Sequence, residues 1–129
     1  MNDDELINII NKAAFEVRKN LTYGYLESVY QNALLIELRN AGLKAETEVP
    51  LNVIYKNNVI GSFKADIIVE NKIIIELKAV NTLLPIHEVQ LVNYLQTTGF
   101  EKGILINYGS PTFAFRIKRK DYPLEHKNK

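Results

Sequence analysis

Apolar side chains recur every three or four residues over residues 3–40, which is the spacing of one helix face. In residues 3–20 this face consists of Leu6, Ile7, Ile10, Ala14 and Val17. The acids at the start of that stretch suit the positive end of a helix dipole. Gly24 interrupts the pattern, and a second helix is predicted from about Leu26 to Asn40, with Gly42 as its cap.

From Lys44 onward the apolar period becomes two, which indicates strands. Asn57-Asn58, in the middle of "LNVIYKNNVIGSF", predicts a tight hairpin turn, because asparagine tolerates a positive φ. A second turn is predicted in "ENK", residues 70–72, between "ADIIV" and "IIIEL". A third helix follows from about Ile86 to Thr98, and two more strands lie in "KGILINYG" and "TFAFRIK". This order predicts an α/β domain with a mixed central sheet and an N-terminal helical pair.

The composition is that of an ordinary globular chain. Its 129 residues are 47% hydrophobic and 24% charged, which favours one domain over residues 1–129 with a core of its own. The absence of cysteine excludes disulfides, cysteine zinc sites and thiol catalysis. Neither a signal peptide nor an apolar run of roughly 20 residues is present, so a cytoplasmic protein without a membrane span is expected. The net charge of +1 is uninformative, although residues 116–129 read as a basic tail.

Three charged residues interrupt the two most apolar strands of the chain. If the second hairpin is centred on Asn71, paired residue numbers sum to 142, so that Asp66 faces Glu76. Side chains on one face alternate by two, so Lys78 shares the face of these two acids. Ala65, Ile67, Ile75 and Leu77 then point to the other face and become buried.

Directly opposed carboxylates destabilise a sheet unless something compensates for them. Two of them about 5 Å apart repel by roughly 3 kcal/mol at an effective dielectric near 20. Such a pair either protonates one acid or holds a cation, and carboxylate oxygens favour Mg²⁺ or Mn²⁺ over zinc. The alternative is an Asp-Lys-Glu salt-bridge cluster with no chemistry.

Two further segments add polar groups in a definite order along the chain. Glu27 lies in the first turn of the second helix, and Gln90 and Tyr94 lie at i and i+4 of the third helix. Each has an ordinary structural interpretation: a favourable charge near a helix start, a solvated glutamine and a half-buried aromatic. His87, at the start of the third helix, is interpreted as a cap or an interface residue rather than a catalytic group.

Together these residues resemble the PD-(D/E)XK nuclease superfamily, in the RecB-like branch that adds a helix acid and a Q-x-x-x-Y helix. More narrowly, "GYLESVY", "IHEVQLVNYL" and "GILINYGS" resemble the GxxExxY proteins, whose signature is matched by Gly24, Glu27 and Tyr30. The resemblance covers about residues 5–120. Ala65 stands where the superfamily has its namesake proline, and Thr22-Tyr23 is a bulkier loop than such proteins usually show.

The resemblance implies a restriction-endonuclease-like core and a Mg²⁺- or Mn²⁺-dependent nuclease that hydrolyses DNA. The implied metal ligands are Glu27, Asp66, Glu76 and the backbone carbonyl of Leu77. Lys78 would then be the catalytic lysine, and Gln90 and Tyr94 would position it, the water or the substrate. The basic groups expected to contact DNA are Lys64, Arg116, Lys118 and Lys120.

Other functions remain open from the sequence. The fold could serve as a non-catalytic module that binds nucleic acid or a partner, which would suit the near-neutral charge. A plain α/β domain with a structural polar cluster is a third interpretation. A domain of this size has little room to surround a duplex, and a homodimer would provide more. The strandedness of the substrate and the mode of cutting are not indicated.

Overall fold

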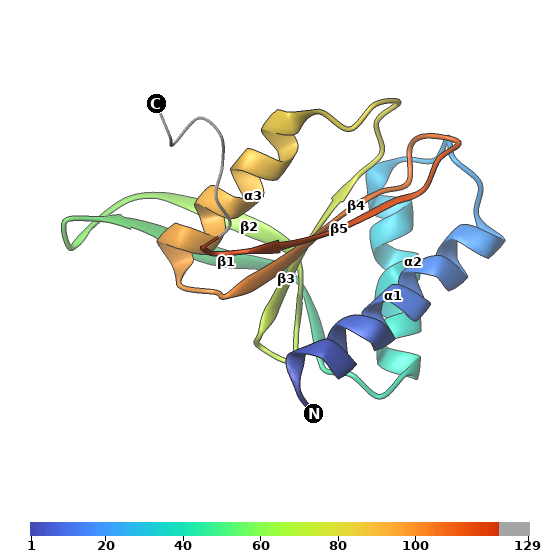
Figure 1. Ribbon diagram of the computed structural model, residues 1–129, viewed down its shortest axis with the longest axis horizontal. Coiled ribbons are helices and arrows are strands. Elements are labelled where there is room, and N and C mark those ends of the chain that lie inside the picture. The colour runs from blue at the N-terminus through green and yellow to red at the C-terminus, as the bar shows by residue number, and fades with distance from the viewer. Residues whose placement is uncertain (122–129) are drawn as a thin grey trace.

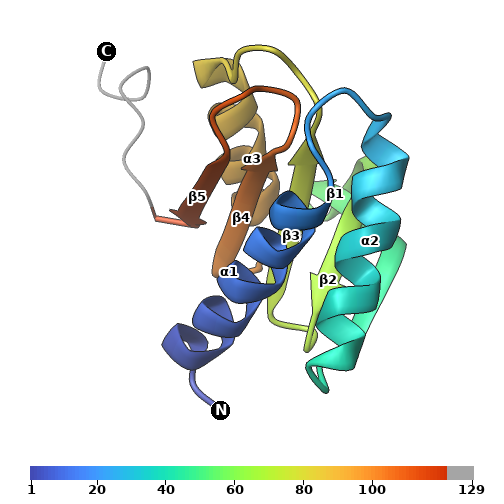
Figure 2. The ribbon, with the colours of Figure 1, turned by 90° about the vertical axis from the view of Figure 1, so that its right-hand side faces the viewer.

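A mixed five-stranded sheet with helices on both faces forms the body of the protein (Figures 1 and 2). The computed structural model describes residues 1–121, and residues 122–129 lie outside the described part. The elements are α1 (Asp3–Asn20), α2 (Glu27–Asn40), β1 (Ala45–Tyr55), β2 (Asn58–Val69), β3 (Ile73–Lys78), α3 (Pro85–Thr98), β4 (Lys102–Asn107) and β5 (Ala114–Arg119). The predicted fold class is confirmed, and each predicted helix is found within one residue of its expected bounds.

The strands follow one another across the sheet in chain order, β1-β2-β3-β4-β5. All neighbours are antiparallel except β3 and β4, which are parallel because α3 connects them as a crossover. Helices α1 and α2 cover one face of the sheet and α3 covers the other (Figure 2). Strands β3 and β4 are therefore buried on both faces, which explains their nearly unbroken apolar sequences.

The ends of the helices follow the expected capping chemistry. Gly42, at φ 84°, donates its N–H to Arg39 O (2.9 Å), while Leu43 N–H reaches back to Leu38 O (3.1 Å). This is the Schellman arrangement that a glycine after a helix favours. At α3, Pro85 occupies the first turn and Gly99 ends the helix at φ 85°.

The first hairpin turn lies one residue earlier than predicted. Tyr55 pairs with Asn58, so the two central residues are Lys56 and Asn57, at φ 47° and 66°, rather than Asn57-Asn58. A two-residue turn with both φ values positive matches the twist of the flanking strands. The second turn is found where it was predicted, with Glu70 and Asn71 at positive φ.

The expectation that Ala65 shares a face with Ile67 is wrong. Ala65 packs in the cluster under α3, whereas Ile67 packs in the cluster under α1 and α2. The change of face occurs across Asp66, next to Glu48 of β1, which has a φ of 51° and no partner in the register. A positive φ inside a strand breaks the regular alternation of side chains, and the sequence gives no sign of it.

A clamp between the ends of β3 and β4 fixes the chain that leaves β3. The Asn107 side chain accepts hydrogen bonds from Val80 N–H (3.1 Å) and Gly109 N–H (3.0 Å), and its amide donates to Val80 O (2.9 Å). Tyr108 N–H adds a bond to Lys78 O (2.9 Å). The clamp therefore holds the segment that follows Lys78 against the segment that follows β4.

The basic residues near the C-terminus do not form a separate tail where the structure describes them. Residues 116–119 belong to β5, and the remainder from 122 onward lies outside the described residues. No helix within residues 1–121 is long and apolar enough to span a membrane.

We expect Gly109→Ala to lower the free energy of unfolding by about 2 kcal/mol or more. A Cβ at this position would lie 2.2 Å from the backbone of Ala79 and Val80, which the Asn107 clamp prevents from moving away. Urea unfolding would measure the loss. Gly61→Ala is the matched control, because nothing lies within 4 Å of its added Cβ. A Gly109→Ala protein as stable as this control would contradict the close approach.

Candidate active site

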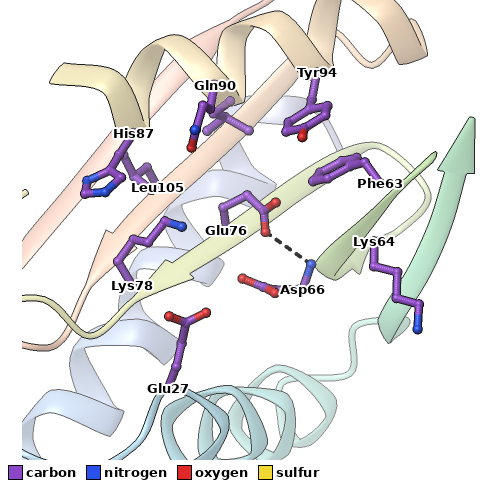
Figure 3. Close-up of a pocket in the computed structure, with 11 residues that line it drawn as sticks. Glu27, Phe63, Lys64, Asp66, Glu76, Lys78, His87, Gln90, Tyr94 and Leu105 are labelled. Carbon is purple, nitrogen blue, oxygen red and sulfur yellow. Dashed lines mark hydrogen bonds between the residues drawn. The ribbon is translucent and has the colours of Figure 1, made fainter. Parts of the chain in front are cut away.

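Strands β2 and β3 separate at the two central acids. The predicted register is confirmed for Val69↔Ile73, Ile68↔Ile74 and Ile67↔Ile75, but the backbone ladder ends there. Beyond it, Asp66 N–H donates to Glu76 Oε2 (3.2 Å; Figure 3) and Leu77 N–H donates to Asp66 Oδ2 (2.8 Å). Carboxylate oxygens thus take the place of backbone carbonyls, and both acids are held at the fork between the strands.

One pocket collects most of the polar residues that the sequence singles out (Figure 3). Glu27 enters from α2, Asp66 and Lys64 from β2, Glu76 and Lys78 from β3, and Gln90 and Tyr94 from α3. The structure adds Phe63, His87, Leu91 and Leu105 to the lining. Glu27, Asp66, Glu76 and Lys78 point toward one another, whereas the Lys64 amine points away from the acids (Figure 3).

Burial and mutual repulsion raise the pKa values of two acids in the pocket. Burial, followed by the charge of Asp66, raises the pKa of Glu76 to about 9, and Lys78 lowers it only in part. Loss of water also raises the pKa of Glu27, and the charges of Asp66 and Glu48 raise it further. Without a cation, burial and the neighbouring Asp66 therefore favour the protonated form of Glu76.

Glu27 is held in place by the loop that precedes α2. Gly24 has a φ of 116°, a conformation that glycine adopts without strain. The buried Tyr30 hydroxyl donates to Thr22 O (2.5 Å) and accepts from Tyr25 N–H (3.2 Å). The Tyr30 side chain thus ties the loop to α2 one turn after Glu27. Gly24 allows the bend in this loop, Tyr30 holds it, and Glu27 follows it at the start of the helix.

Tyr30 is not available to stack on bases, because it is fully buried against Tyr108. The two rings are stacked with centroids 4.8 Å apart, and the Tyr108 hydroxyl donates to Ala14 O (2.8 Å). Tyr23 and Tyr25, in contrast, are each about half exposed.

Helix α3 forms the opposite wall of the pocket. His87 Nδ1 accepts the N–H of Leu84 (3.0 Å), which confirms the expected cap, so the neutral ring carries its proton on Nε2. Tyr94 stacks on Phe63 of β2 with ring centroids 3.7 Å apart and nearly parallel planes. This stack connects α3 to β2 beside the acids.

Comparison with known proteins decides the family. Residues 4–120 match the family model described as the PD-(D/E)XK nuclease superfamily. The chain belongs to the PD-(D/E)XK nuclease superfamily. Its structure is also similar to the crystal structure of SSO0001, with 29% sequence identity and a TM-score of 0.57 over 78% of this chain. The match covers 52% of SSO0001, so this chain spans about half the length of that protein. No curated protein matches.

PD-(D/E)XK nucleases typically use divalent metals, and the donor chemistry of this pocket suits such an ion. Carboxylate oxygens are the ligands of hard cations, and burial, followed by the charge of Asp66, raises the pKa of Glu76 despite the opposing effect of Lys78. Asp66 and Glu76 each use one oxygen for a backbone N–H, which leaves the other for a cation. Within residues 1–121, however, no three His, Asp or Glu side chains are grouped closely enough to hold a metal ion.

Three of the four cations expected to contact DNA pair with carboxylates. Arg116 and the buried Lys118 both contact Glu88 of α3, at 3.8 and 2.5 Å, and Lys120 contacts Glu101 at 3.2 Å. Their part in DNA binding stays a prediction, as does that of the Leu77 carbonyl in binding metal.

Sequence reasoning missed Glu48 and Phe63. The first hairpin places Glu48 opposite Asp66, because its other pairs from Ala45 to Val53 have residue numbers that sum to 114. Applying the register argument to this hairpin would not have found Glu48, because the predicted turn at Asn57-Asn58 makes paired numbers sum to 115 and places Val49 opposite Asp66. Phe63 could not be found in this way, because its partner Tyr94 lies on a helix across the pocket.

We expect Glu76→Gln to raise the melting temperature without metal and to flatten its dependence on pH. The pKa of Glu76 is raised to about 9 in the folded protein from the 4.5 of an unperturbed glutamate, so the folded state binds more protons between these pH values. The free energy of unfolding therefore falls as the pH rises from about 5 to 9. By pH 7 the loss relative to pH 5 or below is on the order of 3 kcal/mol. Gln cannot ionise, yet it retains an acceptor for Asp66 N–H. Melting curves across this range are the measurement, with the exposed Glu101→Gln as control; equal slopes in all three proteins would refute the prediction.

We expect Tyr30→Phe to lower the free energy of unfolding by about 1–3 kcal/mol, because two backbone groups of the Thr22–Tyr25 loop lose their partner. Tyr23→Phe should have almost no effect, because the Tyr23 side chain is 49% exposed. Urea unfolding of both variants tests the difference, and similar stabilities would contradict the role of the Tyr30 hydroxyl.

Proposed function

We propose that this protein is a metal-dependent nuclease that hydrolyses phosphodiester bonds in DNA. The observation that carries the proposal is the fork at Asp66 and Glu76, which faces Lys78 and Glu27 in one pocket of a PD-(D/E)XK chain. A salt-bridge cluster without chemistry is disfavoured, because within the described residues no ion pair joins Lys78 to Glu27, Asp66 or Glu76. Perturbed acids in a pocket are typical of functional sites.

The proposed ligands of Mg²⁺ or Mn²⁺ are Glu27, Asp66, Glu76 and the Leu77 carbonyl. Three carboxylates and one lysine leave a formal charge of −2, which one divalent ion balances. When bound, such an ion lowers the pKa of a coordinated water and neutralises charge on the phosphate. Hydrogen bonds to the backbone fix Asp66 of β2 and Glu76 of β3 at the fork. The loop that Tyr30 holds fixes Glu27 of α2, so the proposed ligands come from three elements.

The remaining polar groups act on the water and the substrate. Lys78 orients or deprotonates the attacking water, or stabilises charge on the transition state. Gln90 and Tyr94 line the pocket from α3 and position the lysine, the water or the substrate strand. The stack on Phe63 holds the Tyr94 ring in a fixed plane for this purpose.

Two finer assignments belong to the same proposal. Gly24, Glu27 and Tyr30 support membership of the GxxExxY proteins, because all three serve the loop that presents Glu27. The helix acid and the Gln90–Tyr94 pair support the RecB-like branch. We further propose that residues 1–129 form a single nuclease-like domain.

We expect Lys78→Ala to reduce cleavage of labelled DNA by about 100-fold or more, since a positioned catalytic group typically contributes that much. Single-stranded, duplex and branched substrates would be compared with Mg²⁺, Mn²⁺ or EDTA. Lys12→Ala, on α1 across the sheet from the pocket, should cut like the wild type. Metal-independent cutting, or equal cutting by all three proteins, would contradict the proposal.

A second readout separates a nuclease from a non-catalytic module that retains the fold. A metal that binds only the folded state stabilises it by about 2.7 kcal/mol at 100 times its Kd. Mg²⁺ or Mn²⁺ should therefore raise the melting temperature, and Asp66→Asn should remove this rise. Metal stabilisation without cleavage would favour the binding module.

A further inference from the structure

The first hairpin extends beyond the sheet as a two-stranded ribbon. Because β2 pairs with β3 only over Ile67–Val69, the stretch from Val49 to Ala65 pairs only with itself. Figure 1 shows this ribbon reaching away from the body of the molecule, past α3. We refer to residues 49–65 as the arm.

The arm is anchored at its base and exposed at its tip. Val49, Leu51 and Phe63 pack against the cluster under α3. The side chains at the tip are apolar but exposed: Ile54 (44%), Tyr55 (58%), Val59 (60%) and Ile60 (63%). Large apolar groups gathered at an exposed site mark a binding surface more often than chance exposure.

The irregularities of the arm disfavour pairing with another strand. Val53 pairs with Gly61 but Ile54 pairs with Val59, which leaves Ile60 as an extra residue in a bulge. Pro50 lies on β1, the outer strand of the sheet. Bulges and edge prolines are devices that prevent edge-to-edge association. The arm is therefore better suited to contact through its side chains than through β-sheet extension with a second copy.

The charge of the arm matches a polyanion. Residues 49–65 contain Lys56 and Lys64 but no acid, and neither lysine pairs with a carboxylate in the described part of the chain. Lys56 Nζ lies 5.5 Å from the Tyr55 ring centroid, so a cation and an exposed aromatic ring stand together at the tip. Proteins that bind single strands combine aromatic stacking on bases with cations along the backbone.

We propose that the arm binds unpaired nucleotides of the substrate strand, with Tyr55 and Ile60 against bases and Lys56 on a phosphate. This inference rests on the proposed nuclease function. The arm leads directly from the pocket, because Phe63 and Lys64 at its base also line the pocket. From Phe63 to Val59 the strand spans roughly 13 Å, the length of about four stacked nucleotides. A substrate must therefore extend at least about four nucleotides beyond Phe63 to reach the tip.

The test compares Tyr55→Ser/Ile60→Ser with Ile36→Ser, which makes the Ile→Ser change alone at a position on α2 that is 59% exposed. Fluorescence anisotropy with a labelled single-stranded 12-mer in EDTA measures affinity without turnover. We expect the arm variant to bind at least about fivefold more weakly, since stacking on one base is worth about 1–3 kcal/mol. The control should match the wild type. Lys56→Gln should reduce the slope of log K against log salt by about 0.7.

Hydrolysis of bis(4-nitrophenyl) phosphate distinguishes failure of the arm from failure of the nuclease. This diester is too short to reach the tip, so the arm variant should hydrolyse it at the wild-type rate while losing activity on the 12-mer. Equal affinity of the arm variant and the control for the 12-mer would overturn the proposed role of the arm without affecting the proposed nuclease function. Arm-dependent binding without hydrolysis of either substrate would overturn the nuclease and uphold the arm. A preference for blunt duplex, or a dimer that the arm variant abolishes, would overturn the assignment to unpaired nucleotides.

Discussion

The exchange of hydrogen bonds at Asp66 and Glu76 determines the rest of the structure. A continued ladder would have left two like charges facing each other inside a sheet, which is costly. Instead, each carboxylate accepts a backbone N–H, so the acids are stabilised as part of the strand separation. The same separation releases β2 from β3 and allows the first hairpin to leave the sheet. The pocket and the arm thus have one physical origin.

The segments around the pocket are fixed by a few residues whose roles are purely structural. Gly24 and Tyr30 shape the loop before Glu27, while Asn107 and Gly109 hold the chain after Lys78. None of these residues lines the pocket. Sequence motifs that contain these four residues therefore include residues that support the pocket as well as residues that line it. This explains why the segments "GYLESVY" and "GILINYGS" lie beside the pocket.

Apolar spacing and turn residues were sufficient to predict the helices, the order of the elements along the chain and the register of the second hairpin beside its turn, because each depends on local sequence. The acids came together for the same reason. The position of the first turn and the face of Ala65 were wrong, because both depend on positive φ values at Lys56 and Glu48, residue types that give no such signal. The pairing of Lys118 with Glu88 joins β5 to α3 and could not be read from either segment alone.

Helix α3 is connected to both outer parts of the sheet. Glu88 joins it to Lys118 of β5, and Tyr94 joins it to Phe63 at the base of the first hairpin. Gln90 lies between these two attachments, above the acids (Figure 3). Helix α3 therefore braces the first hairpin against β5, on the other side of the sheet. The place of Gln90 above the acids depends on both attachments, although neither of them touches the acids themselves.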